Sequence, residues 1–156
     1  MQYSTLYQSP IGPIQLIEKD GKITNLSFLS NEDERNDIPS KETAILKKAK
    51  QELEEYFDGK RKEFDLPLSF SGTPFQEKVW NTLCTIPYGQ TKSYQEIAIQ
   101  VGSPKSCRAI GLTNHINPIG IFVPCHRVVG KNGKLVGYAG GIDKKSYLLN
   151  LEKQNL

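Results

Sequence analysis

The residues best suited to chemistry in this chain are two neighbours, Cys125 and His126, within the run Pro-Cys-His-Arg-Val at positions 124–128. The thiolate form of cysteine is a strong nucleophile, and a nearby imidazole can generate it by taking the proton. Adjacent residues in a turn seldom point at each other, so we expect His126 to act on Cys125 through a water molecule. A carboxylate on the far ring nitrogen would fix the imidazole tautomer, and Glu152 is our candidate for it.

From the residues alone, a structural role for these positions stays open. A single cysteine after an apolar run, here residues 119–123, is usually a small core residue. A single histidine usually caps a turn. Glu152 is expected near the end of the last helix, where a negative charge is unfavourable for the helix dipole. That position slightly favours a functional reason for the carboxylate.

The cysteine and histidine counts argue against other chemistries. The chain has three cysteines without C-x-x-C spacing and two histidines. These numbers disfavour a disulfide framework and a four-thiolate zinc site, so we expect no metal and no cofactor. The first residues lack the pattern of a secretory signal, and no apolar run is long enough to cross a bilayer. We therefore expect a cytoplasmic protein with reduced thiols and no membrane partner.

Two capping boxes predict the helices that position the motif. They are Thr-Pro-Phe-Gln at positions 73–76 and Ser-Tyr-Gln-Glu at positions 93–96. The first opens a helix that ends before Pro87, and the second opens a short helix that ends near Gly102. A third helix is expected from Ser103-Pro104 to about His115. Short helices joined by a Gly-Ser-Pro turn are typical of a helix-turn-helix unit, although many helical hairpins do not bind DNA.

Beyond these helices, the apolar, β-branched residues 119–123 predict a strand that ends at Pro124. Residues 128–129 and 135–136 flank Gly-Lys-Asn-Gly-Lys, which predicts a hairpin. A last helix is expected from about Asp143 through Leu151.

The first half of the chain has a different pattern. Residues 3–8, 14–18 and 22–28 predict three strands, and a helix capped by Ser40 follows up to Gly59. Residues 60–72 predict a linker with one strand. The expected fold class is α/β in the α+β sense. It combines a small N-terminal α/β domain with antiparallel strands, residues 1–70, and a mainly helical C-terminal domain, residues 71–156, with a winged-helix-like helix-turn-helix and the active-site cysteine.

Charge also separates the two halves. Residues 71–156 hold 10 Lys and Arg against 4 Asp and Glu, a net charge of +6, whereas residues 1–70 hold 10 against 13, a net charge of −3. This distribution suggests that only the second half meets a polyanion such as DNA. A chance scatter of solvated lysines would give the same counts.

The run Asn-Pro-Ile-Gly-Ile-Phe-Val-Pro-Cys-His-Arg-Val at positions 117–128 resembles the signature of the methylated-DNA–protein-cysteine methyltransferases, or O6-alkylguanine-DNA alkyltransferases. The similarity covers essentially all of residues 73–153 and, more faintly, the turn at residues 9–12. Its other segments fall in order and at family spacing: Tyr88-Gly89, Ser93-Tyr94, residues 106–111, residues 137–141, and Leu148-Leu149 through Glu152. The whole ordered set is much more specific than the Pro-Cys-His-Arg-Val run alone.

The resemblance implies that Cys125 accepts a methyl or alkyl group from O6 of guanine, and from O4 of thymine, in double-stranded DNA. Because a thioether is a very poor leaving group, each molecule would react once. Glu152, His126 and a bridging water would form the relay that yields the thiolate. The damaged nucleotide would be flipped out of the duplex by a helix-turn-helix that binds the minor groove.

The resemblance also implies roles for the remaining site residues. Tyr94 would donate to guanine N3, and the carbonyls of Cys125 and Val128 would accept from its amine. Tyr138 would wall the alkyl pocket, and the Ala139 amide would point at O6. Asn117 would tie the helix-turn-helix to the active-site turn. On the recognition helix, Arg108 would fill the space left by the base, beside the small residues Ser106, Cys107 and Ala109.

Two rival functions remain. A DNA-binding module without transfer activity would share this scaffold, but the alkyltransferase-like proteins carry tryptophan where Cys125 stands. A thiol hydrolase usually draws its cysteine and histidine from distant segments rather than from neighbours. We expect a monomer that acts as a single-turnover transferase.

Overall fold

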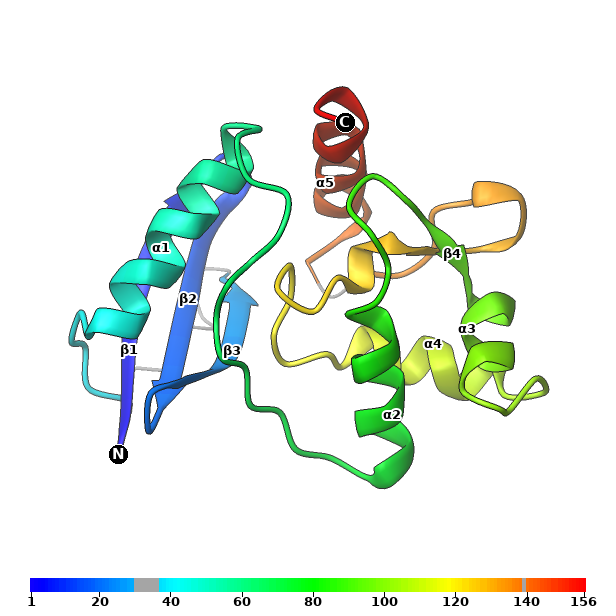
Figure 1. Ribbon diagram of the computed structural model, residues 1–156, viewed down its shortest axis with the longest axis horizontal. Coiled ribbons are helices and arrows are strands. Elements are labelled where there is room, and N and C mark those ends of the chain that lie inside the picture. Colours follow the sequence, from blue (N-terminus) through cyan, green and yellow to red (C-terminus); the bar gives the residue numbers. More distant parts are fainter. Residues whose placement is uncertain (30–36, 139) are drawn as a thin grey trace. The chain divides into compact units, whose positions relative to one another are not determined.

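The computed structural model describes residues 1–29, 37–138 and 140–156, and it divides into two compact units, Met1–Phe70 and Ser71–Leu156. The first unit contains a β-sheet covered by a helix, and the second is mainly helical (Figure 1). This organisation confirms the expected α+β fold class. No helix within the described ranges is long and apolar enough to span a membrane.

The three strands predicted in the first unit are confirmed. Strands β1 (Gln2–Ser9), β2 (Gly12–Lys19) and β3 (Lys22–Phe28) form an antiparallel sheet in that order. The turn between β2 and β3 uses Asp20 and Gly21, whose φ angles of 54° and 81° are those of a tight hairpin turn. The register next to the turn therefore follows from local turn chemistry, and a β-bulge between Ile17 and Glu18 shifts it farther along the strands.

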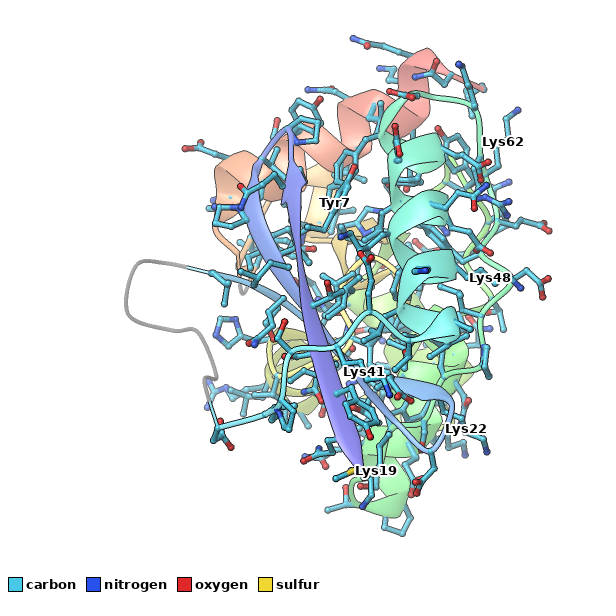
Figure 2. All side chains as sticks on the ribbon, turned by 90° about the vertical axis from the view of Figure 1, so that its left-hand side faces the viewer. Tyr7, Lys19, Lys22, Lys41, Lys48 and Lys62 are labelled. Carbon is cyan, nitrogen blue, oxygen red and sulfur yellow. The ribbon has the colours of Figure 1, made fainter. Side chains whose placement is uncertain are left out.

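Helix α1 (Ala44–Phe57) covers this sheet with one apolar side. Leu46 and Leu53 are completely buried in the resulting core. Tyr7 of β1 stacks on Phe57 with 6.4 Å between the ring centroids, and Figure 2 shows Tyr7 beside the helix. The first unit thus has its own hydrophobic core.

The predicted N-cap of α1 is wrong. Thr43 caps the helix, because its side chain accepts from an amide of the first turn at 3.4 Å. Ser40 forms a bridge with β1 instead. The Ser4 amide donates to the Pro39 carbonyl at 2.9 Å, and the Lys41 amide donates to the Ser4 carbonyl at 3.0 Å. A residue held in this extended pairing cannot begin a helix.

The strand expected within residues 60–72 is reduced to one bridge, between Leu68 and Ile23 of β3. The Ile23 amide donates to the Pro67 carbonyl at 2.9 Å, and the Ser69 amide donates to the Ile23 carbonyl at 2.9 Å. The segment therefore extends the sheet at a single position.

The helices of the second unit's helix-turn-helix are α2 (Pro74–Leu83), α3 (Tyr94–Gln100) and α4 (Cys107–His115). All three pack against one another. Both predicted capping boxes are present, at Thr73 and Ser93. The indole nitrogen of Trp80 in α2 donates to the Thr113 carbonyl in α4 at 3.0 Å, which ties these two helices together.

Helix α4 begins later than predicted. Its N-cap is Ser106, which makes no side-chain cap hydrogen bond, and residues 103–106 form a turn closed by the Ser106 amide and the Ser103 carbonyl at 2.9 Å. The Gln95 side chain of α3 donates to the Pro104 carbonyl at 2.9 Å. The segment before α4 is thus tied to α3 as a turn, and α4 begins after it.

The strand predicted over residues 119–123 is wrong. These side chains are buried, but the backbone makes tight turns in which the Val123 amide donates to the Ile119 carbonyl at 2.9 Å. Ile121 has a φ of 67°, which is incompatible with a strand. Burial explains the apolar composition, because a short buried run lacks the periodicity that would distinguish a strand from a turn.

The predicted hairpin is also wrong in its pairing. Its loop closes as expected, since the Gly130 amide donates to the Lys134 carbonyl at 2.7 Å. Strand β5 (Val128–Val129), however, pairs in parallel with β4 (Lys92–Ser93) and not with residues 135–136. The chain ends in α5 (Ile142–Gln154), which confirms the last predicted helix.

Candidate active site

Cys125 is the first residue of a short 3₁₀ helix, Cys125–Arg127, that begins after Pro124. Its side chain is only 3% exposed. The Cys125 amide donates to the Val123 carbonyl at 2.7 Å and so continues the tight turns of residues 119–123. A buried turn, not the end of a strand, therefore carries the thiol.

The structure brings His126 and Glu152 together in the interior of the second unit. Nε2 of His126 lies 2.7 Å from Oε2 of Glu152, and neither side chain is more than 1% exposed. Nδ1 of His126 is buried and makes no hydrogen bond within the part of the chain that is described. The ring therefore has one nitrogen oriented by the carboxylate and one nitrogen available for a further proton.

The protonation states of this pair suit a base and its orienting carboxylate. Burial lowers the pKa of His126 from its ordinary 6.5, although Glu152 acts to raise it. Burial acts to raise the pKa of Glu152, but hydrogen bonds and charge from His126 and Arg127 outweigh burial and hold that pKa well below 4.5. At neutral pH the imidazole is therefore uncharged and the carboxylate ionised.

Arg127 completes this network, and the sequence had indicated it only as part of a motif. Its Nε and Nη2 each lie 2.9 Å from a different oxygen of Glu152, and its Nη1 donates to the Ile86 carbonyl at 2.7 Å. The Gly89 amide also donates to Glu152, at 3.1 Å. An arginine inside an apolar run is itself a signal for a buried ion pair.

The thiol lies among groups that act on its ionisation. Burial raises the pKa of Cys125, whereas Asn117, Lys145 and Tyr138 act to lower it. Burial and Cys125 together raise the pKa of Tyr138 well above 10.0. The site therefore holds a protonated thiol and a protonated phenol in its resting state.

Lys145 of α5 was missed by sequence reasoning. It is fully buried, and its Nζ donates to the carbonyls of Val136 at 3.0 Å and Gly137 at 3.4 Å. Burial lowers its pKa from 10.5 to about 8, while Cys125 acts to raise it. Helical periodicity could have found it, because Lys145 and Glu152 are seven residues apart and share the buried side of α5.

Two asparagine side chains brace the turn that carries the thiol. Asn117 Nδ2 donates to the Val123 carbonyl at 2.9 Å, and Asn114 Nδ2 donates to the Cys125 carbonyl at 3.2 Å. Tyr94, at the start of α3, donates its hydroxyl to the Val136 carbonyl at 3.1 Å. Asn114 was not singled out from the sequence, where it is one polar residue among several in α4.

The predicted DNA-contacting residues form a separate group at the start of α4. Arg108 and Ala109 are exposed, and Ser106 and Cys107 are half-buried. The thiol of Cys107 donates to the side-chain oxygen of Gln95 at 3.0 Å.

Two further predicted site residues lie elsewhere. Val128 is buried in β5 beside the 3₁₀ helix. Ala139 lies outside the described residues. Among the residues that are described, no cluster of three potential metal ligands occurs.

Fold and site together define a class of protein that combines a small α/β unit with a helix-turn-helix unit, and the latter carries a buried cysteine and a His–Glu–Arg network. Two family models match these same parts. Residues 74–154 match the DNA-binding domain of 6-O-methylguanine DNA methyltransferase, and residues 2–70 match its ribonuclease-like domain. The chain belongs to the 6-O-methylguanine DNA methyltransferase family.

Individual relatives agree along nearly the whole chain. The constitutive methylated-DNA–protein-cysteine methyltransferase of Bacillus subtilis is 51% identical over 98% of this chain and 96% of its own. The methylated-DNA–protein-cysteine methyltransferase of Methanosarcina barkeri is 47% identical over 99% of both chains. The solved structure of Mycobacterium tuberculosis OGT in complex with DNA is 46% identical, with a TM-score of 0.89 over 99% of this chain and 93% of that one.

Proposed function

We propose that this chain repairs alkylated DNA by transferring an alkyl group from O6 of guanine to Sγ of Cys125. The observation that carries this proposal is the buried His126–Glu152 pair, 2.7 Å apart, adjacent to a buried cysteine in a fold of this family. In the reaction the S–C bond forms as the C–O6 bond breaks, and the thiol proton ends on the departing guanine. The chain is therefore a methylated-DNA–protein-cysteine S-methyltransferase.

His126 removes the thiol proton as attack begins. Because burial keeps Cys125 protonated at rest, the thiolate forms only when a base takes its proton. Nδ1 of His126 is the nitrogen that accepts it, through one bridging water, and Glu152 stabilises the resulting imidazolium. Arg127 keeps Glu152 ionised throughout.

The base reaches the thiol by leaving the duplex. O6 of a stacked guanine cannot approach a buried cysteine, so the nucleotide must rotate into the site. We assign α4 to the minor groove, with the exposed Arg108 in the space that the base vacates. Ser106, Cys107 and Ala109 are small enough for close backbone approach at this end of α4.

Inside the site, Tyr94 donates to guanine N3, and the carbonyls of Cys125 and Val128 accept from the 2-amino group. Tyr138 lies against the alkyl group beside Cys125, and the backbone amide of Ala139 donates to O6. Asn117 couples α4 to the turn that carries the thiol, which its hydrogen bond to Val123 supports. These assignments combine the geometry of the described residues with the pattern of the family.

Transfer occurs once per molecule, because a thioether does not release its alkyl group in water. O4-alkylthymine is a second, slower substrate, since it lacks the 2-amino group. The protein acts as a monomer, and it acts in the cytoplasm, where a reducing environment preserves the free Cys125 thiol.

Intact mass and peptide mapping after incubation with a duplex containing one O6-methylguanine test this function. One added methyl on Cys125, saturating at one equivalent and absent from Cys125→Ser, is the expected result. Unchanged mass of reduced protein that still binds the duplex would contradict the transferase and leave a damage-recognition module.

A further inference from the structure

Asn114 holds one of the groups that the proposed function places on the 2-amino edge of the base. It lies in α4 and is 3% exposed. Its Nδ2 donates to the Cys125 carbonyl at 3.2 Å. Only the amide nitrogen can donate to a carbonyl, so this contact defines which way the side chain faces.

Tyr94 supplies the donor for the same edge. Its hydroxyl donates to the Val136 carbonyl at 3.1 Å. Burial and Cys125 raise the pKa of Tyr94, so the hydroxyl keeps its hydrogen at neutral pH.

These two partners match one edge of guanine. N3 is an acceptor and the neighbouring 2-amino group is a donor, whereas Tyr94 offers a donor and the Cys125 carbonyl offers an acceptor. The carbonyl has two lone pairs, so it can accept from Asn114 and from the base together. One buried amide of α4 therefore holds the acceptor that this edge requires.

We propose that Asn114 is a positioning residue that holds the Cys125 carbonyl where it accepts from the 2-amino group of guanine, while Tyr94 donates to N3. This inference rests on the proposed function. Asn114 makes transfer selective for an alkylated base that has a 2-amino group over a base that lacks this group. The selectivity comes from α4, the same helix that we assign to the DNA.

A matched pair of substrates tests this role: duplexes with O6-methylguanine or with O6-methylhypoxanthine, which lacks only the 2-amino group. The readout is the ratio of the two single-turnover rates of transfer to Cys125. We expect Asn114→Leu to lower this ratio by roughly tenfold, the worth of one well-placed hydrogen bond. Because both rates come from one preparation, the ratio does not depend on the fraction of folded protein.

The matched control is Thr113→Val, which alters the neighbouring buried residue of α4 and keeps its volume. It should leave the ratio unchanged. Asn114→Ala, which removes the amide without adding an apolar branch, serves as the second variant should Asn114→Leu not fold.

The outcomes separate this inference from the proposed function. If both substrates slow equally in Asn114→Leu and Asn114→Ala, or if the ratio rises, Asn114 does not position the Cys125 carbonyl and the inference is overturned. If wild-type protein transfers from neither substrate, the proposed function itself fails.

Discussion

Arg127 holds both carboxylate oxygens of Glu152, with its Nε and Nη2 each 2.9 Å from one of them. Both side chains are buried, so this ion pair is made in the interior of the second unit. A buried carboxylate with a bidentate partner stays ionised and keeps one orientation. The orientation of Glu152, and of the His126 ring that it contacts, therefore depends on Arg127.

Arg127→Met leaves Glu152 buried without its cation. We expect it to lower the free energy of unfolding by about 3 kcal/mol, because one partner of a buried ion pair has been removed. Arg127→Lys keeps the charge but loses the planar two-point contact with Glu152, so we expect it to lower the transfer rate. Urea unfolding measures the loss of stability, and single-turnover transfer measures the loss of rate. Wild-type stability in Arg127→Met would contradict the structural role of the pair.

The transfer rate should depend on pH through His126. Since burial holds the pKa of His126 below 6.5, the imidazole stays a competent base down to that pH and is protonated only below it. The single-turnover rate should therefore be flat from pH 8 to the ordinary histidine pKa of about 6.5 and fall at lower pH. His126→Asn should be slower by roughly a hundredfold and should lose this acid limb. A rate that already falls at neutral pH would show that His126 is not the base.

Lys145 should make stability rise with pH in an alkaline window. Its pKa is about 8 in the folded chain and 10.5 as its ordinary value, so the unfolded chain binds more protons between these limits. Stability then increases with pH across this window. Cys125, whose pKa is raised above 9.0, acts in the opposite direction at higher pH. The quantity to measure is thus the difference in unfolding free energy between wild type and Lys145→Met at pH 8 and pH 10.

The unfolding free energy of wild type, relative to that of Lys145→Met, should therefore increase as the pH rises. Lys144→Met is the matched control, since Lys144 neighbours Lys145 on α5 but is half-exposed, and it should show no such trend. Lys145→Met should also slow transfer, because the carbonyls of Val136 and Gly137 lose their donor. A difference that is independent of pH would mean that Lys145 is charged throughout.

Arg108 should matter only when the base is delivered from a duplex. We expect Arg108→Ala to slow transfer from O6-methylguanine DNA by at least about tenfold, because the flipped state loses the side chain that replaces the base. Transfer from free O6-benzylguanine should be nearly unchanged. Lys131→Ala, which removes a positive charge from the loop after β5, controls for general electrostatic attraction. Equal losses on both substrates in Arg108→Ala would contradict the assigned role.

Local signals in the sequence were enough for much of the fold. The capping boxes at Thr73 and Ser93 form as predicted, because a cap is made between residues three positions apart. The hairpin between β2 and β3 follows from Asp20-Gly21 for a similar reason. Cys125 and His126 are neighbours in the chain, and Glu152 could be proposed because a carboxylate late in a helix is unfavourable for the helix dipole.

The features that only the tertiary structure decided involve contacts between residues that are far apart in the chain. Residues 119–123 form buried turns, and β5 pairs with β4, because contacts across the second unit outweigh local propensity. The burial of Arg127, Lys145 and Asn114 depends on which distant carbonyls and carboxylates they meet, so the local signals at Arg127 and Lys145 could not identify their partners. The sequence by itself thus determined the family, the helices and the candidate for the reacting cysteine. Only packing determined the ionisation of the site and the side chains that hold its groups in place.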